Sequence, residues 1–112
     1  MKLRIESPGF RVSASLKKFI TDKFGSIDKY YADVQEVEVT LLNEVKKGKE
    51  VVNCTLNIRI PGKDEYIKSS SYIFEDAVLK AAEAAKRRLR IRKTQLLQAR
   101  KKKSGNRNVA GR

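Results

Sequence analysis

The sequence predicts an α+β fold with the order β-α-β-β-β-α, in which a four-stranded, mainly antiparallel sheet carries two helices on one face. Two stretches repeat apolar residues every three or four positions, which is typical of amphipathic helices. Four shorter stretches alternate apolar and polar residues, which is typical of half-buried strands. The last three strands have only turn-like segments between them, so they are expected to pair antiparallel.

Each predicted strand places its apolar residues on one face of the sheet. In the cleanest of them, apolar residues hold every second position from 52 to 60. A charged loop over residues 44–50, with Gly48 as its pivot, and a tight turn over residues 61–64 are expected to join the last three strands. The four predicted strands are residues 2–6, 34–43, 51–60 and 66–71. The sheet face that meets water is expected to carry Lys2, Arg4, Glu36, Glu38, Thr55, Asn57 and Arg59.

The first predicted helix runs from about residue 14 to residue 30, with Ser13 as its N-cap. Its apolar stripe passes straight through Gly25. We therefore expect one continuous helix that tolerates this glycine at a cost of about 1 kcal/mol.

The second predicted helix begins near Tyr72, with Ser70 or Ser71 as a possible cap, and continues to Lys103. It contains no Gly or Pro, its first turn is acidic, and its later turns are basic, as the helix dipole favours. Its apolar face ends near Leu89. Beyond that residue we expect the helix to outrun the sheet, so that every side of its later turns is free.

The length of 112 residues allows one hydrophobic core and leaves a short extension. From Ser104 onwards the sequence has no periodicity and few apolar residues. We expect a single domain over residues 1–100, followed by a basic, disordered tail over residues 101–112.

The positive charge is concentrated in the last quarter of the chain. Residues 1–85 contain 14 Lys and Arg and 13 Asp and Glu, whereas residues 86–112 contain 12 Lys and Arg and no acid. The last acid is Glu83. A block of one sign repels itself, so a polyanion is the natural partner.

Enzyme chemistry has little support in the sequence. The chain has no histidine, and its single cysteine, Cys54, is in phase with the core face of a strand. No metal-ligand spacing, phosphate-binding glycine loop or nucleophile elbow occurs. We expect a protein that is not an enzyme, with no cofactor, no metal and no small-molecule substrate. Without a membrane-length apolar run or a secretion signal, the expected location is the cytoplasm.

Cations follow each other closely on the second helix. Six of them lie within about 12 Å of helix axis, a spacing comparable with that of nucleic-acid phosphates. These six are Lys86, Arg87, Arg88, Arg90, Arg92 and Lys93. A solvated, solubilising face is the alternative interpretation, but the absence of acids after Glu83 favours phosphate binding. Because most aromatic residues are in phase with the core, recognition of structured RNA through its backbone is preferred over base stacking.

Local sequence patterns add a family resemblance. Residues 16–24 read LKKFITDKF and residues 27–31 read IDKYY, while residues 74–78 read FEDAV and residues 84–89 read AAKRRL. Over about residues 1–100, these segments and their order resemble the short form of the ribosome hibernation promoting factor and ribosome-associated inhibitor family, which is similar to sigma-54 modulation proteins. The family fold is the same β-α-β-β-β-α arrangement, similar to double-stranded-RNA-binding domains.

The resemblance implies a translational silencer of stationary phase or stress. It would bind the small ribosomal subunit in the channel for messenger and transfer RNA, and so keep ribosomes idle. The basic residues that match family positions in the two helices are Lys23, Lys29, Lys80, Lys86, Arg87 and Arg90. Together with Arg88, Arg92 and Lys93 from the run of cations, they form the predicted RNA-binding set.

Two other functions stay open at this point. One is a general regulatory module that binds structured RNA or DNA through the same cations. The other is an interaction protein that uses the acid-bearing strands 34–43 and 51–60. Whether the protein promotes ribosome pairing or only silences single ribosomes is also open.

Overall fold

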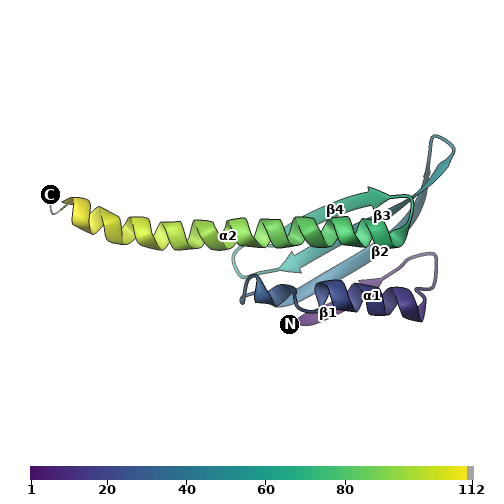
Figure 1. Ribbon diagram of the computed structural model, residues 1–112, viewed down its shortest axis with the longest axis horizontal. Helices are drawn as coiled ribbons and strands as arrows, with labels where there is room; N and C mark the ends of the chain where they lie inside the picture. Colours follow the sequence, from purple (N-terminus) through teal and green to yellow (C-terminus); the bar gives the residue numbers. More distant parts are fainter. Residues whose placement is uncertain (111–112) are drawn as a thin grey trace.

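A computed structural model describes the backbone of residues 1–110 and the side chains of residues 1–99. It confirms the α+β fold and the predicted order of its elements (Figure 1). The strands are β1 (Lys2–Glu6), β2 (Glu36–Lys46), β3 (Lys49–Arg59) and β4 (Glu65–Ser71). The helices are α1 (Ala14–Phe24), the short 3₁₀ helix η1 (Ile27–Lys29) and the long α2 (Phe74–Ala110).

The sheet has the order β1-β2-β3-β4 and is mainly antiparallel, as predicted. Only β1 and β2 run parallel, with Leu3 opposite Val37, while β2, β3 and β4 pair antiparallel. A parallel pair needs a crossover connection, and α1 provides it between β1 and β2. Both helices lie on the same face of the sheet (Figure 1).

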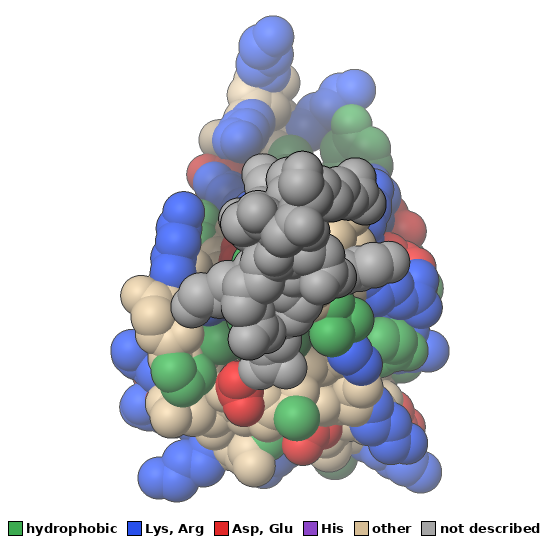
Figure 2. Space-filling view, turned by 90° about the vertical axis from the view of Figure 1, so that its left-hand side faces the viewer, with side chains coloured by type: hydrophobic (Ala, Val, Ile, Leu, Met, Phe, Trp, Pro, Cys, Tyr) green, Lys and Arg blue, Asp and Glu red, His purple; other side chains and the backbone are tan. Residues whose placement is uncertain are grey.

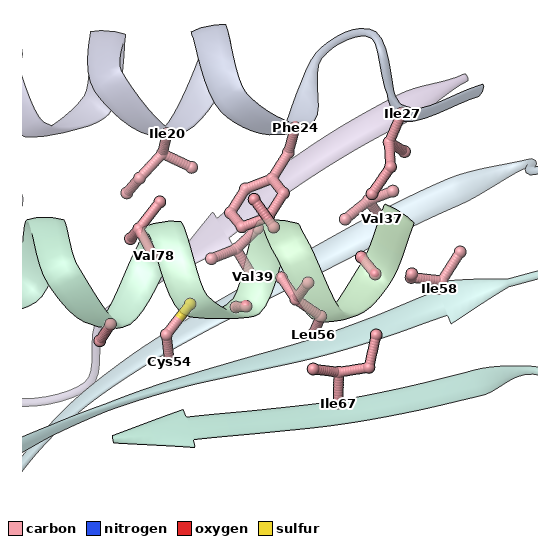
Figure 3. Packing of buried hydrophobic residues seen from close by; sticks show 14 of the residues in the cluster. Ile20, Phe24, Ile27, Val37, Val39, Cys54, Leu56, Ile58, Ile67 and Val78 are labelled. Carbon is pink, nitrogen blue, oxygen red and sulfur yellow. The ribbon is translucent and has the colours of Figure 1, made fainter. Parts of the chain in front are cut away.

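The core fills the space between the helices and the sheet. Ile20 and Phe24 from α1, Val78 from α2 and Leu56 from β3 are fully buried and point toward one another (Figure 3). Cys54 lies among them, and its burial raises the pKa of its thiol to about 12. The assignment of Cys54 to the core is therefore confirmed.

The prediction of one continuous helix through Gly25 is wrong. Helix α1 ends at Phe24, and Gly25 is its C-cap, with its N–H donating to the carbonyl oxygen of Thr21 at 2.7 Å. The backbone is so tight here that a Cβ on residue 25 would lie 2.5 Å from that same oxygen. The apolar spacing continues past Gly25 because the 3₁₀ helix η1 follows almost directly, and its residue Ile27 is buried in the core. The spacing therefore looks like that of one unbroken helix.

The predicted seven-residue loop between β2 and β3 is also wrong. The two strands stay paired as far as Lys46 and Lys49, so only Lys47 and Gly48 form the turn. Both residues have positive φ, 52° for Lys47 and 76° for Gly48. This two-residue geometry matches the right-handed twist of the flanking strands, which explains why pairing continues through charged sequence.

Helix α2 begins two residues later than predicted, at Phe74, and neither candidate serine caps it. The Ser71 hydroxyl donates to Asp76 Oδ2 at 2.5 Å, and the Ser70 hydroxyl donates to Asn53. The helix continues to Ala110, past the predicted end at Lys103.

The division into a domain over residues 1–100 and a tail over residues 101–112 stays a prediction. The side chains of residues 100–112, and the backbone of residues 111 and 112, lie outside the described part of the chain.

The sheet face away from the helices carries an ion-pair network. Arg59 contacts Glu38 at 2.8 Å and Glu36 at 3.1 Å, and Arg4 contacts Glu36 at 3.7 Å. The hydrogen bond with Glu38, followed by that residue's charge, raises the pKa of Arg59. These acids neutralise Arg59 and offset the charge of Arg4, so this part of the open face offers little net positive charge to a polyanion.

Candidate nucleic-acid interface

The long helix places several cations near the segment that follows α1. Figure 2 looks along the molecule from the C-terminal end of α2, and Lys and Arg side chains stand at intervals around the rim of this view, with acids also visible among them. All 13 acids of the chain belong to the described residues. The ion pairs between described side chains therefore show which cations are neutralised.

The ring of Tyr30 is contacted by two of these cations. Tyr30 follows η1, and the two cations come from α2: Lys86 Nζ lies 5.7 Å and Arg90 Cζ 5.2 Å from the ring centroid. Like charges four residues apart on a helix repel by about 0.2–0.5 kcal/mol. Each cation–π contact contributes about 0.5–1 kcal/mol at an exposed site. The ring thus outweighs the repulsion and allows both cations to stay on one side of the helix.

Lys29 and Lys93 are brought together one helical turn further along. Both line a groove of about 220 Å³ between the segment after η1 and α2. Tyr31, Leu96, Leu97 and Asp33 also line this groove. The groove continues the cationic surface from Tyr30 towards the projecting part of α2.

Arg87 is exposed on α2, one residue after Lys86 and three residues before Arg90. Among the described side chains, no acid comes within ion-pair distance of Arg87, Arg90 or Lys93. Lys86 contacts Glu83 at 3.8 Å, near the limit of an ion pair, and that glutamate is largely exposed. Such surface pairs contribute little, so these cations stay available to an outside anion.

Arg88 and Arg92 point instead towards β4. Arg92 contacts Glu65 Oε2 at 3.1 Å and also donates to the backbone oxygens of Pro61 and Lys63. Arg88 contacts the other oxygen of Glu65 at 3.4 Å. The expectation that every side of α2 is free beyond Leu89 is wrong, because the turn between β3 and β4 reaches back and covers Arg92.

Arg92 therefore has a structural role of its own. Its side chain is only 18% exposed and that of Glu65 only 12%. On its other side, the guanidinium carbon lies 5.6 Å from the Tyr31 ring centroid. Arg92 ties the sheet, the segment after η1 and α2 together, and so fixes the direction in which α2 leaves the domain. The predicted role of Arg88 and Arg92 in RNA binding stays a prediction.

Lys80 and Lys23 have local partners of their own. Lys80 donates to the carbonyl oxygen of Ser70 at 3.3 Å and pairs with Asp76 at 3.4 Å, beside β4. Lys23 on α1 is half-buried, with its Nζ 5.4 Å from the ring centroid of Phe19. The predicted set thus divides into a group around Tyr30 and cations with local partners.

Tyr30 and Tyr31 are the residues that the sequence did not assign to the surface. The apolar spacing of the first predicted helix continues to these two residues, yet both are only partly buried and each lies under a cation of α2. The sequence offered no clear signal for this position, because adjacent residues of one helix can both be buried, as Ala81 and Ala82 are on α2.

The fold and this surface define a small α+β domain whose second helix carries a row of exposed cations. A family model described as sigma 54 modulation protein / S30EA ribosomal protein matches residues 3–97. The chain belongs to this family, which confirms the resemblance found in the sequence.

Two solved structures share the fold. A ribosomal subunit interface protein from Coxiella burnetii is 17% identical, with a TM-score of 0.70 over 84% of this chain and 99% of its own. The N-terminal domain of Protein Y from Thermus thermophilus is 13% identical, with a TM-score of 0.66 over 80% of this chain and 97% of its own. A comparison with curated proteins gave no match.

Within the described residues, no helix has a segment long and apolar enough to cross a membrane. The same part of the chain holds no group of three or more Cys, Asp or Glu placed to bind a metal ion.

Proposed function

We propose that the protein is a translational silencer that binds the small ribosomal subunit in the channel for messenger and transfer RNA. It acts in the cytoplasm during stationary phase or stress, and it contacts ribosomal RNA. Its role is binding without catalysis, and it needs no cofactor and no small-molecule substrate. Family membership supports the ribosome as the partner.

One observation carries the proposal. Arg87, Arg90 and Lys93 lie exposed on α2, and no acid of the described chain pairs with them, whereas the arginines of the open sheet face are neutralised. Lys86, beside the Tyr30 ring, and Lys29, in the groove that Tyr31 lines, extend this surface. We call these five cations the Tyr30-side surface; they are Lys29, Lys86, Arg87, Arg90 and Lys93.

A surface of this kind binds phosphates through charge, with arginine forks suited to two phosphate oxygens. It presents few donors and acceptors aimed at base edges, so it reads the shape of folded RNA more than its sequence. The channel of the small subunit for messenger and transfer RNA would offer such a target.

Sedimentation of the purified protein with small ribosomal subunits tests the proposal. The wild type should move with the subunits at low salt, and the double reversal Arg87→Glu with Arg90→Glu should stay at the top of the gradient. Lys47→Glu with Lys49→Glu is the matched control, because it changes the charge equally at the β2–β3 hairpin, away from the projecting end of α2 (Figure 1). A wild type that stays at the top at low salt contradicts the proposal.

The alternative function is a general module that binds structured RNA or DNA. It is favoured by the same observation, since phosphate contacts carry no sequence information. A competition assay separates the two functions. Bulk duplex RNA of equal phosphate concentration should displace the protein from ribosomal subunits under the alternative, and should fail to do so if the channel is the specific target.

A further inference from the structure

Tyr30 is more than a packing residue in this fold. Its ring is only partly buried, and its remaining surface lies beneath two side chains that sit four residues apart on α2. Lys86 is 30% exposed, which is low for a lysine on the outer part of a helix. The aliphatic stems of such side chains pack on a ring while their charged ends stay in water.

Two flexible cations that repel each other would otherwise spread over many rotamers. Binding a phosphate chain then requires both to be ordered at once, and that ordering opposes association. A ring that both cations already contact removes part of this entropy loss before the RNA arrives. The contact also keeps the two charges on the side of α2 that faces α1.

We infer that Tyr30 is a positioning residue of the RNA-binding surface, which holds Lys86 and Arg90 in the places from which they contact phosphates. The inference rests on the proposed function and adds to it an aromatic residue that need not touch RNA itself. The reason Tyr30 is available for this role is the helix break at Gly25, after which η1 turns the chain and delivers residue 30 to the flank of α2.

Three single variants test the inference in a salt-controlled binding assay with purified small ribosomal subunits. Tyr30→Leu keeps apolar bulk but removes the ring, and it should weaken binding about fivefold, the loss expected for a modest cation–π contact to each cation. Tyr30→Phe keeps the ring and should stay within about twofold of the wild type. Tyr66→Leu removes a tyrosine that is 63% exposed on the open sheet face, and it should change nothing.

A double-mutant cycle separates positioning from a general loss of structure. In a Lys86→Gln and Arg90→Gln background, Tyr30→Leu should cause no further loss of affinity, because the cations it positions are gone. A similar fivefold loss in that background, or a Tyr30→Leu affinity equal to the wild type, overturns the inference. Failure of the wild-type protein to bind subunits at all would instead refute the proposed function, so the two results are distinguishable.

Discussion

At the scale of single residues, Gly25 ends α1 and so determines how the chain reaches the candidate site. Alanine in place of a helical glycine normally stabilises a protein by about 0.4–1 kcal/mol, because it restricts the unfolded chain. At Gly25, however, the added Cβ would lie 2.5 Å from the Thr21 carbonyl oxygen, which is backbone and cannot move aside easily. The steric term therefore outweighs the entropic one.

We predict that Gly25→Ala lowers the free energy of unfolding by about 1–3 kcal/mol. Urea denaturation followed by circular dichroism measures it. Lys18→Ala, at an exposed position of the same helix, is the control and should stay within about 0.5 kcal/mol of the wild type. A stabilised Gly25→Ala protein would mean that the helix break does not depend on this glycine.

Cys54 supplies a second prediction at this scale. Burial raises the pKa of its thiol to about 12, so the thiolate that reacts with disulfide reagents is scarce in the folded protein at neutral pH. The unfolded thiol titrates near pH 8.5, so the contribution of Cys54 to stability is fully present below about pH 8.5 and declines as the pH rises towards 12. Titration with a chromogenic disulfide reagent at pH 8 should label no thiol in the folded protein and one thiol per chain in urea. Fast labelling of the folded protein would show that Cys54 is accessible.

At the scale of elements, the contact between α2 and the β3–β4 turn decides where the cations point. Glu65 receives both Arg88 and Arg92, but the two arginines differ in exposure, at 55% for Arg88 and 18% for Arg92. A partly buried pair with additional backbone hydrogen bonds is harder to lose than an exposed one. Because both arginines contact the same carboxylate, substituting each in turn compares an exposed ion pair with a partly buried one.

We predict that Arg92→Leu lowers the free energy of unfolding by about 1–3 kcal/mol, since it leaves Glu65 Oε2 and two backbone oxygens without their donor. Arg88→Leu should change it by about 0.5 kcal/mol or less. Equal losses in the two variants would contradict the anchoring role of Arg92. Subunit affinities of the same proteins test the prediction that both arginines also bind RNA.

At the scale of the whole molecule, the fold separates neutralised charge from available charge. The extents of 64 × 31 × 19 Å reflect a long α2 that projects well past the sheet (Figure 1). Arginines on the open sheet face are paired with acids of β2, while the Tyr30-side surface adjoins the base of the projection. An anion therefore approaches the protein most favourably along the helices.

This asymmetry predicts the salt dependence of subunit binding. The logarithm of the association constant should fall linearly with the logarithm of salt concentration, and Arg87→Gln should reduce the slope by about 1, because one phosphate contact is lost. Lys49→Gln at the hairpin should leave the slope unchanged. A slope that both substitutions reduce equally would place the binding surface elsewhere or spread it over the whole molecule.

The sequence predicted the fold class and the element order because hydrophobic periodicity records which face of each element is buried. It did not predict the end of α1, because the stripe from Phe24 to Ile27 looks the same with or without a break at Gly25. It also gave no sign that Arg92 is held by Glu65, since the two residues are distant in sequence and meet only through the β3–β4 turn. Tyr30 was assigned to a core face because its contacts with Lys86 and Arg90 also join residues that are distant in sequence.

By itself, the sequence determined the α+β class, the order of the elements and the concentration of net positive charge after Glu83, because hydrophobic periodicity and net charge are properties of the chain alone. Tertiary structure decided which of those cations are neutralised, which are held on tyrosine rings, and which remain exposed. The physical reason is that pairing depends on distances of a few ångströms between side chains. The packing of η1 and the β3–β4 turn against α2 sets those distances.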